Sequence, residues 1–190
     1  EKKLDVDAHV TTVLFNDQYK MLYNRRELKD VRKMTDKDYT PGGMTALLDA
    51  VGRTIHKMDM VSGIHRKDKG NKVLFVIITD GEENDSKEYT YADVKKLIKD
   101  RQENAGWEFI FLGANIDAAA AAENLGIDRD RAVKYKNTGS GVRANFKAVA
   151  ELSDSLAKSG RVSDEWKETV EKDEDDAADK QSAAVTSPRR

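Results

Sequence analysis

An almost unbroken apolar run is the strongest structural signal in this chain. Val73–Thr79, VLFVIIT, is rich in β-branched residues and is followed directly by Asp80 and Gly81. A run of this composition is typical of an interior parallel strand that is buried on both faces. The pattern therefore predicts a central strand with a carboxylate at its carboxyl end and a sharp glycine turn behind it.

Four further stretches have the residue pattern of β-strands. His9–Phe15 and Tyr19–Asn24 lie on either side of a short polar turn, which predicts a hairpin. Trp107–Leu112, WEFIFL, is apolar and aromatic and predicts the next strand after the central one. Ala132–Tyr135 predicts a short last strand.

Apolar residues recur at helical spacing between these strands. In the longest of the helices Phe146, Val149 and Leu152 are expected to face the core. The predicted helices are a short one around Leu28–Met34 and longer ones over Thr45–Met60, Tyr91–Asn104, Asp117–Leu125 and Val142–Ser159. Strands that alternate with helices predict an α/β fold, with a parallel sheet that carries helices on both faces.

The composition separates a folded region from an acidic end. The chain has 190 residues, and its 38% hydrophobic content supports one substantial core. We expect an α/β domain over residues 1–160 and an acidic, mostly disordered tail over 161–190. Within that tail, Val162–Val170 predicts one or two helical turns around Trp166.

Charge and cysteine content exclude several classes of function. The formal net charge is −2, which gives no reason to expect a nucleic acid as partner. The absence of cysteine excludes disulfides, thiolate metal sites and cysteine nucleophiles. No apolar run approaches the roughly 18 residues that a membrane-spanning helix needs.

Two side chains suggest a metal site. Asp80 follows the central strand, and ligands of open α/β sheets bind at the carboxyl ends of the strands. Thr45 follows two glycines at the start of a predicted helix, so its hydroxyl is expected at the same edge. Oxygen ligands of this kind suit Mg²⁺, Mn²⁺ or Ca²⁺. A turn or capping role for Asp80 and an N-cap role for Thr45 are the structural alternatives.

Two segments together resemble the von Willebrand factor A domain. They are Pro41–Gly52, PGGMTALLDAVG, and Val73–Asn84, VLFVIITDGEEN, and the hairpin and the strand Trp107–Leu112 fit the same order. The resemblance implies a doubly wound, mostly parallel sheet with one antiparallel edge strand. It also implies a metal-ion-dependent adhesion site in which Thr45 and Asp80 are ligands, Asp80 often through water.

The chain lacks one part of that family pattern. The family's first strand ends in Asp-x-Ser-x-Ser, which supplies the remaining protein ligands, and nothing in this sequence matches it. That strand is the centre of the family's sheet, between His9–Phe15 and Val73–Thr79. Without it two strand edges would be left unpaired. We therefore expect a longer natural polypeptide, or a strand supplied from elsewhere by self-association or strand exchange.

The leading functional hypothesis is a protein-binding module of the adhesion or scaffold type, not an enzyme. A cation held by few protein charges would bind an Asp or Glu of a partner protein. The expected partner-binding rim consists of Gly42, Gly43, Glu82, Glu83, Asn84 and Asn115. The alternatives are a metal-dependent phosphohydrolase-like enzyme and a metal-free structural interaction domain. Stand-alone family members of bacteria and phages suggest a cytoplasmic location.

Overall fold

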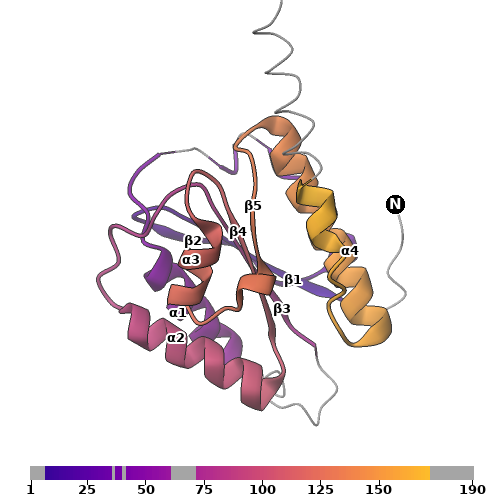
Figure 1. Cartoon of the computed structure of the whole chain (residues 1–190), viewed down its shortest axis with the longest axis horizontal. Helices are drawn as coiled ribbons and strands as arrows, with labels where there is room; N and C mark the ends of the chain where they lie inside the picture. The colour runs from indigo at the N-terminus through magenta and orange to yellow at the C-terminus, as the bar shows by residue number, and fades with distance from the viewer. Residues whose placement is uncertain (1–6, 36, 40–41, 61–71, 172–190) are drawn as a thin grey trace, which may run out of the picture. The chain divides into compact units, whose positions relative to one another are not determined.

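The computed structural model describes residues 7–35, 37–39, 42–60 and 72–171 (Figure 1). The chain divides into two compact units, each built from segments that are not contiguous in sequence. The first unit contains Glu1–Asn71 and Glu82–Gly106, and the second contains Lys72–Gly81 and Trp107–Arg190. The fold is mixed α/β, with a two-stranded antiparallel hairpin in the first unit and a three-stranded parallel sheet in the second.

The predicted hairpin is confirmed in the first unit. Strand β1, His9–Phe15, pairs antiparallel with β2, Tyr19–Glu27, which is three residues longer than its apolar pattern indicates. The register shifts between Val10 and Val13. Such an irregularity bends the ribbon and increases its twist.

The predicted helix around Leu28–Met34 is wrong. Only a single 3₁₀ turn, η1, forms over Leu28–Asp30. The residues after it are held as a loop, because the Arg32 guanidinium donates two hydrogen bonds to the Asp38 carboxylate, which also accepts from the Thr35 N–H. This segment has too few apolar residues to bury a helical face.

Two helices complete the first unit. Helix α1, Leu47–Asp59, is buried on nearly all sides over its first two turns. Helix α2, Tyr91–Asp100, begins with a capping box in which Thr90 and Asp93 satisfy each other's backbone N–H groups. It continues as a π turn, Arg101–Ala105, and ends at Gly106, whose φ of 69° is left-handed. The predicted N-cap at Thr90 is thus confirmed.

The second unit contains the parallel sheet. Its strands are β3, Leu74–Thr79, β4, Glu108–Gly113, and β5, Ala132–Lys134, in the order β3-β4-β5. Helix α3, Ala118–Asn124, connects β4 to β5, and α4, Gly139–Ser159, follows β5. All three strands lie within one or two residues of their predicted positions.

The apolar run alone predicts an interior strand, but β3 has one unpaired edge among the described residues, as expected when the family's first strand is missing. Strand β3 stands at one end of the three-stranded sheet and, among the described residues, has a neighbour only in β4. Four of its six side chains are partly exposed, whereas five of the six in β4 are buried. An apolar run shows that a strand avoids water, but it does not show on how many sides the strand is paired.

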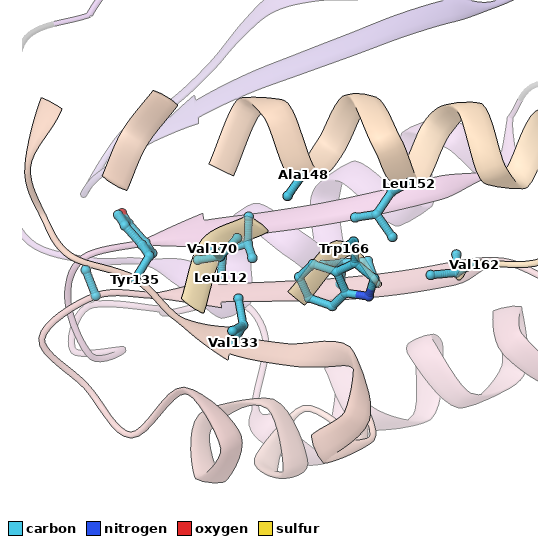
Figure 2. Packing of buried hydrophobic residues seen from close by; sticks show 10 residues of the cluster. Leu112, Val133, Tyr135, Ala148, Leu152, Val162, Trp166 and Val170 are labelled. Carbon is cyan, nitrogen blue, oxygen red and sulfur yellow. The ribbon is translucent and has the colours of Figure 1, made fainter. Parts of the chain in front are cut away.

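The core of the second unit lies between its sheet and α4 (Figure 2). Leu112 and Val133 from the sheet, Leu152 from α4 and Trp166 from the segment beyond it share this cluster. Residues 166–171 form the predicted helical turn, and Trp166 is 2% exposed. Packing therefore extends beyond residue 160, while most of the acidic sequence lies outside the described residues.

The inward face of α4 agrees with the predicted one except at Phe146. Leu152 is buried and Val149 packs against the core as predicted, whereas Phe146 is 58% exposed. Gly141, Asn145 and Ala148 are buried as well. The small residues Gly141 and Ala148 form the first half of this face, and Leu152 and Leu156 continue it. Within the described part of the chain, no helix is long and apolar enough to cross a membrane.

Candidate functional site

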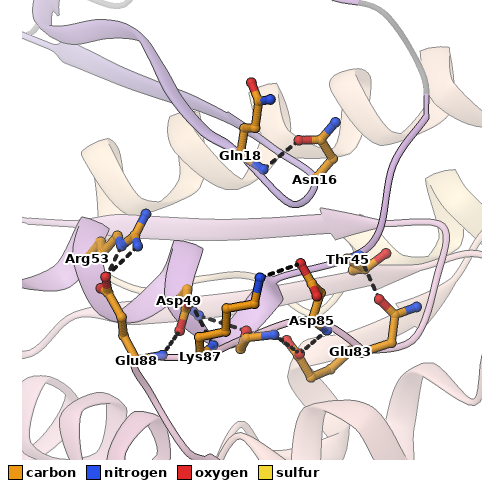
Figure 3. Close-up of polar contacts among 11 residues, drawn as sticks. Asn16, Gln18, Thr45, Asp49, Arg53, Glu83, Asp85, Lys87 and Glu88 are labelled. Atoms are coloured by element: carbon orange, nitrogen blue, oxygen red, sulfur yellow. Dashed lines mark hydrogen bonds and ion pairs between the residues drawn. The ribbon is translucent and has the colours of Figure 1, made fainter.

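The glycine loop before α1 is anchored by the turn of the hairpin. Asn16 Nδ2 donates to the Gly42 carbonyl at 2.8 Å, and the Ala46 N–H donates to the Asn16 carbonyl at 2.9 Å. Asn16 Oδ1 accepts from the Gln18 N–H at 2.7 Å, which fixes its side chain (Figure 3). One asparagine thus holds both ends of the loop.

Gly43 is required by conformation and by space. Its φ is +88°, a left-handed value that side chains other than glycine rarely adopt. A Cβ at this position would collide with the Asp17 carboxylate and with Nδ2 of Asn16. Gly42 has a φ of +137°, but the space around it is open.

Thr45 is joined to the loop that follows Asp80 in sequence. Its N–H donates to Asn84 Oδ1 at 2.8 Å, and the Asn84 N–H donates to the Thr45 carbonyl at 3.0 Å (Figure 3). Thr45 is partly buried, and no described residue forms a hydrogen bond with its hydroxyl. It is not the N-cap of α1, because that position belongs to Ala46.

The Glu83 carboxylate is turned inward and fully engaged. Oε2 accepts from the Leu48 N–H at 2.9 Å, in the first turn of α1, and from the Ser86 hydroxyl. Oε1 accepts from the N–H groups of Asp85 and Ser86. A carboxylate at the start of a helix satisfies N–H groups that would otherwise lack partners. Glu83 therefore organises the rim from within, whereas Glu82 is exposed.

Asp49 is the most heavily used carboxylate of the first unit. It is 6% exposed and accepts three consecutive backbone N–H groups, from Lys87, Glu88 and Tyr89, at 2.9–3.0 Å (Figure 3). Burial acts to raise the pKa of Asp49, but these three donors outweigh it, so the net shift is downward. The ionised carboxylate thus clamps the loop to α1.

Two neighbours of Asp49 complete the clamp. The Tyr89 ring lies against Gly52, where a Cβ would meet the ring at about 2.5 Å. Arg53 forms a two-pronged ion pair with Glu88 at 2.6 and 2.8 Å. The hollow between the hairpin turn and this loop has a volume of about 120 Å³. It is smaller than the roughly 300 Å³ at which small-molecule pockets begin.

Asp80 belongs to the second unit and is exposed at the carboxyl end of β3. Its Oδ2 accepts from Asn137 Nδ2 at 3.1 Å, from the loop between β5 and α4. The turn behind it is closed by the Thr79 hydroxyl, which donates to the Gly81 carbonyl at 3.0 Å. Among the described residues, Asn137 is the only hydrogen-bond partner of the Asp80 carboxylate.

Asn115 lies at the same edge of the parallel sheet. It follows β4, is exposed, and has a left-handed φ of 58°, a conformation that asparagine tolerates better than most residues. The N-terminus of α4 is capped by the Thr138 hydroxyl, which accepts from the Gly141 N–H at 3.2 Å.

The predicted site residues thus form two groups. Gly42, Gly43, Thr45, Glu83 and Asn84 are brought together in the first unit, together with the exposed Glu82. Asp80 and Asn115 share one edge of the sheet in the second unit. No group of three or more His, Cys, Asp or Glu side chains that could hold a metal ion occurs in the described ranges.

Comparison with known proteins adds no relative. No protein-family model matches the chain, and neither a curated protein nor a solved structure gives a match. The resemblance to the von Willebrand factor A domain therefore rests on the sequence segments alone and stays a prediction.

The sequence did not indicate the roles of three residues whose side chains hold the loops in place. Asn16 and Asn137 are loop asparagines of a common kind, and nothing in the sequence indicates which carbonyl or carboxylate they reach. Asp49 carries a weak signal, because an acid between the apolar residues of a helix is costly to bury unless it is paired.

Proposed function

We propose that this chain is a protein-binding module that holds a divalent cation at the carboxyl edge of its sheet and presents it to a carboxylate of a partner. The proposal includes the doubly wound sheet with an antiparallel edge strand that the resemblance implies. The observation that carries it is the pair of hydrogen bonds between Thr45 and Asn84. These bonds tie together the two segments on which the resemblance rests, although they are 39 residues apart.

The donor chemistry agrees with a hard cation. The Thr45 hydroxyl has no described hydrogen-bond partner, and the Asp80 carboxylate is exposed with one neutral partner. Hydroxyl and carboxylate oxygens suit Mg²⁺, and also Mn²⁺ or Ca²⁺. Two protein ligands leave most of the coordination shell to water. A partner carboxylate would then replace water and neutralise charge in one step.

Only two protein groups, the Thr45 hydroxyl and the Asp80 carboxylate, are proposed as metal ligands. This small number supports a second candidate function. The Asp-x-Ser-x-Ser segment is absent from the sequence, and no larger acidic cluster replaces it among the described residues. A metal-free interaction domain is therefore the alternative. In that case Gly42, Gly43 and the Glu83 network would serve only to shape the rim.

Calorimetric titration with Mg²⁺ and Mn²⁺ separates the two candidates. We expect weak binding by the wild type that is lost in Asp80→Ala and in Thr45→Val, which removes the hydroxyl at nearly constant volume. Glu82→Ala is the matched control, because this exposed carboxylate lies two residues from Asp80. No heat of binding by the wild type at millimolar Mn²⁺ would favour the metal-free domain.

A second measurement tests recognition of a carboxylate. Acetate added to the Mn²⁺ complex should displace bound water and lower the water-proton relaxation enhancement. Chloride at the same ionic strength should not. Hydrolysis of phosphoesters or nucleotides with Mg²⁺ that disappears in Asp80→Asn would instead support the enzyme alternative.

A further inference from the structure

Among the described residues, the backbone groups on the outer edge of β3 have no hydrogen-bond partner. The Val73 carbonyl accepts from the Glu108 N–H and the Thr79 carbonyl from the Ala114 N–H, so the odd-numbered residues of β3 direct their backbone toward β4. Alternate residues of a strand point their N–H and C=O groups in opposite directions. Leu74, Val76 and Ile78 therefore present theirs to the other side, where no described strand is hydrogen-bonded to β3.

The sequence of β3 itself contains none of the residues that usually protect an edge strand from pairing. Strand β3 reads LFVIIT, without a charge, a proline or a glycine. Proteins commonly place lysine, proline or a bulge on edge strands to prevent association. Leu74, Val76 and Ile78 pack against the core cluster and still remain partly exposed.

Helix α4 adds a second apolar surface next to this edge. Val142 and Phe146 are 38% and 58% exposed, and Val149, at the same helical spacing, is partly buried against the core cluster. Residues 162–171 cover the opposite flank of α4. The Ser163 N–H donates to the Ser155 hydroxyl, and the Thr169 hydroxyl donates to the Glu151 carboxylate.

The covered flank of α4 lies toward β5. Asp164 of the covering segment pairs at 2.8 Å with Arg131, which immediately precedes β5. The Val142–Phe146–Val149 stripe therefore lies on the side of the β3 edge.

A buried amide in α4 lacks partners at the same place. Asn145 is 1% exposed, and neither its Nδ2 nor its Oδ1 has a hydrogen-bond partner among the described residues. It lies three residues after Val142 and four before Val149, so it borders the exposed stripe. Leaving such a group unsatisfied destabilises the fold.

We propose that the open edge of β3 pairs antiparallel with β3 of a second copy of this chain. Lys72 and Asp80 bracket the strand, and both are exposed. Each has one neutral partner: Lys72 Nζ donates to the Leu156 carbonyl, and Asp80 accepts from Asn137. In an antiparallel pair centred on Val76, Lys72 of each copy lies opposite Asp80 of the other, and Leu74 lies opposite Ile78 on the same face. A parallel pair would instead bring like charges together and would not close into a twofold dimer.

The oligomeric state and amide exchange test this proposal directly. Sedimentation equilibrium in EDTA, which removes any dependence on the proposed cation, should show a reversible monomer–dimer equilibrium. Over the same concentrations, hydrogen exchange of the Leu74, Val76 and Ile78 amides should slow as dimer forms. The Phe75 and Ile77 amides serve as the internal control, since they face β4 in either state.

Charge reversal tests the register. Asp80→Lys should raise the dimer dissociation constant about tenfold, because the lost ion pair occurs twice in each dimer. The double variant Lys72→Asp, Asp80→Lys should restore it. Phe146→Glu, at an exposed position, should weaken the dimer without unfolding the chain.

Three outcomes would overturn the proposal. A monomer at every concentration excludes the second copy. Slow exchange of the Leu74, Val76 and Ile78 amides in the monomer means that another segment covers the edge. A dimer that responds to neither Asp80→Lys nor Phe146→Glu uses a different surface.

Discussion

The N–H of Thr45 donates to Oδ1 of Asn84 at 2.8 Å, and the N–H of Asn84 donates to the Thr45 carbonyl at 3.0 Å. This reciprocal pair closes the glycine loop onto the loop that contains Glu83. Since Glu83 also caps the first turn of α1, three elements meet around a few hydrogen bonds. The stability of that arrangement can be measured independently of any ligand.

Asn84→Ala should lower the free energy of unfolding by about 1 kcal/mol, the typical contribution of one hydrogen bond. The variant leaves the Thr45 N–H without its acceptor, while the backbone N–H of residue 84 is retained. Urea unfolding followed by circular dichroism measures the change. Glu82→Ala, at an exposed neighbouring position, should change stability by less than about 0.5 kcal/mol. Equal losses in the two variants would contradict the role given to Asn84.

Asp49 should make stability depend on pH in the acid range. Its pKa is lowered from the ordinary value of 3.8, because its three N–H donors outweigh the effect of burial. The folded state therefore binds fewer protons than the unfolded state between the two pKa values. The contribution of Asp49 is complete above about pH 4 and is lost as the pH falls through the folded pKa.

Urea unfolding of the wild type and Asp49→Asn between pH 2 and 7 measures this contribution. The variant should be less stable at neutral pH, and its stability should fall less on acidification. Asp128→Asn, an exposed aspartate without a described side-chain hydrogen bond, should retain the wild-type pH profile. If Asp49→Asn retains that profile too, the clamp does not depend on charge.

Gly43→Ala should destabilise the chain more than Gly42→Ala. Both glycines have positive φ values, so both substitutions cost about 1–3 kcal/mol in backbone strain. Only at Gly43 must Asn16 Nδ2 also move, which breaks its bond to the Gly42 carbonyl and adds about 1 kcal/mol. Thermal unfolding of the two variants side by side measures the difference, and equal melting temperatures would exclude the crowding at Gly43.

Trp166→Ala should cost about 3–5 kcal/mol, because it empties a large site in the core of the second unit. Phe146→Ala is the matched aromatic control and should cost less than about 1 kcal/mol, since the ring is more than half exposed. Chemical denaturation at low protein concentration keeps any dimer from contributing. A small effect at Trp166 would mean that residues 162–171 are not part of the cooperative core.

The order and type of the main elements follow from local pattern. The β-branched runs and the helical spacing locate β1 to β5 and α1 to α4 within a few residues, because each signal is contained in the element itself. The failed helix at Leu28–Asp30 had no comparable apolar stripe. Where the local apolar pattern agrees with the burial of the residues, the sequence alone predicts the type and position of the element.

The remaining differences all concern relationships between distant residues. The apolar sequence of β3 does not show whether the strand lies at the edge or at the centre of its sheet. Phe146 is more apolar than Asn145, yet Asn145 is the buried one, together with Gly141 and Ala148. Likewise the sequence placed Glu83 on an outer rim, whereas its oxygens hold Leu48 and Ser86.

The division of the chain into two interleaved units has a consequence for its synthesis. Because β3 pairs with β4 some thirty residues later, the ten-residue segment Lys72–Gly81 must wait until Glu82–Gly106 has been made before it finds its neighbour. During that interval LFVIIT is an unpaired apolar segment of the nascent chain. Chaperones bind segments of this kind, and aggregation can begin at them. A shortage of chaperones during synthesis should therefore lower the yield of this protein.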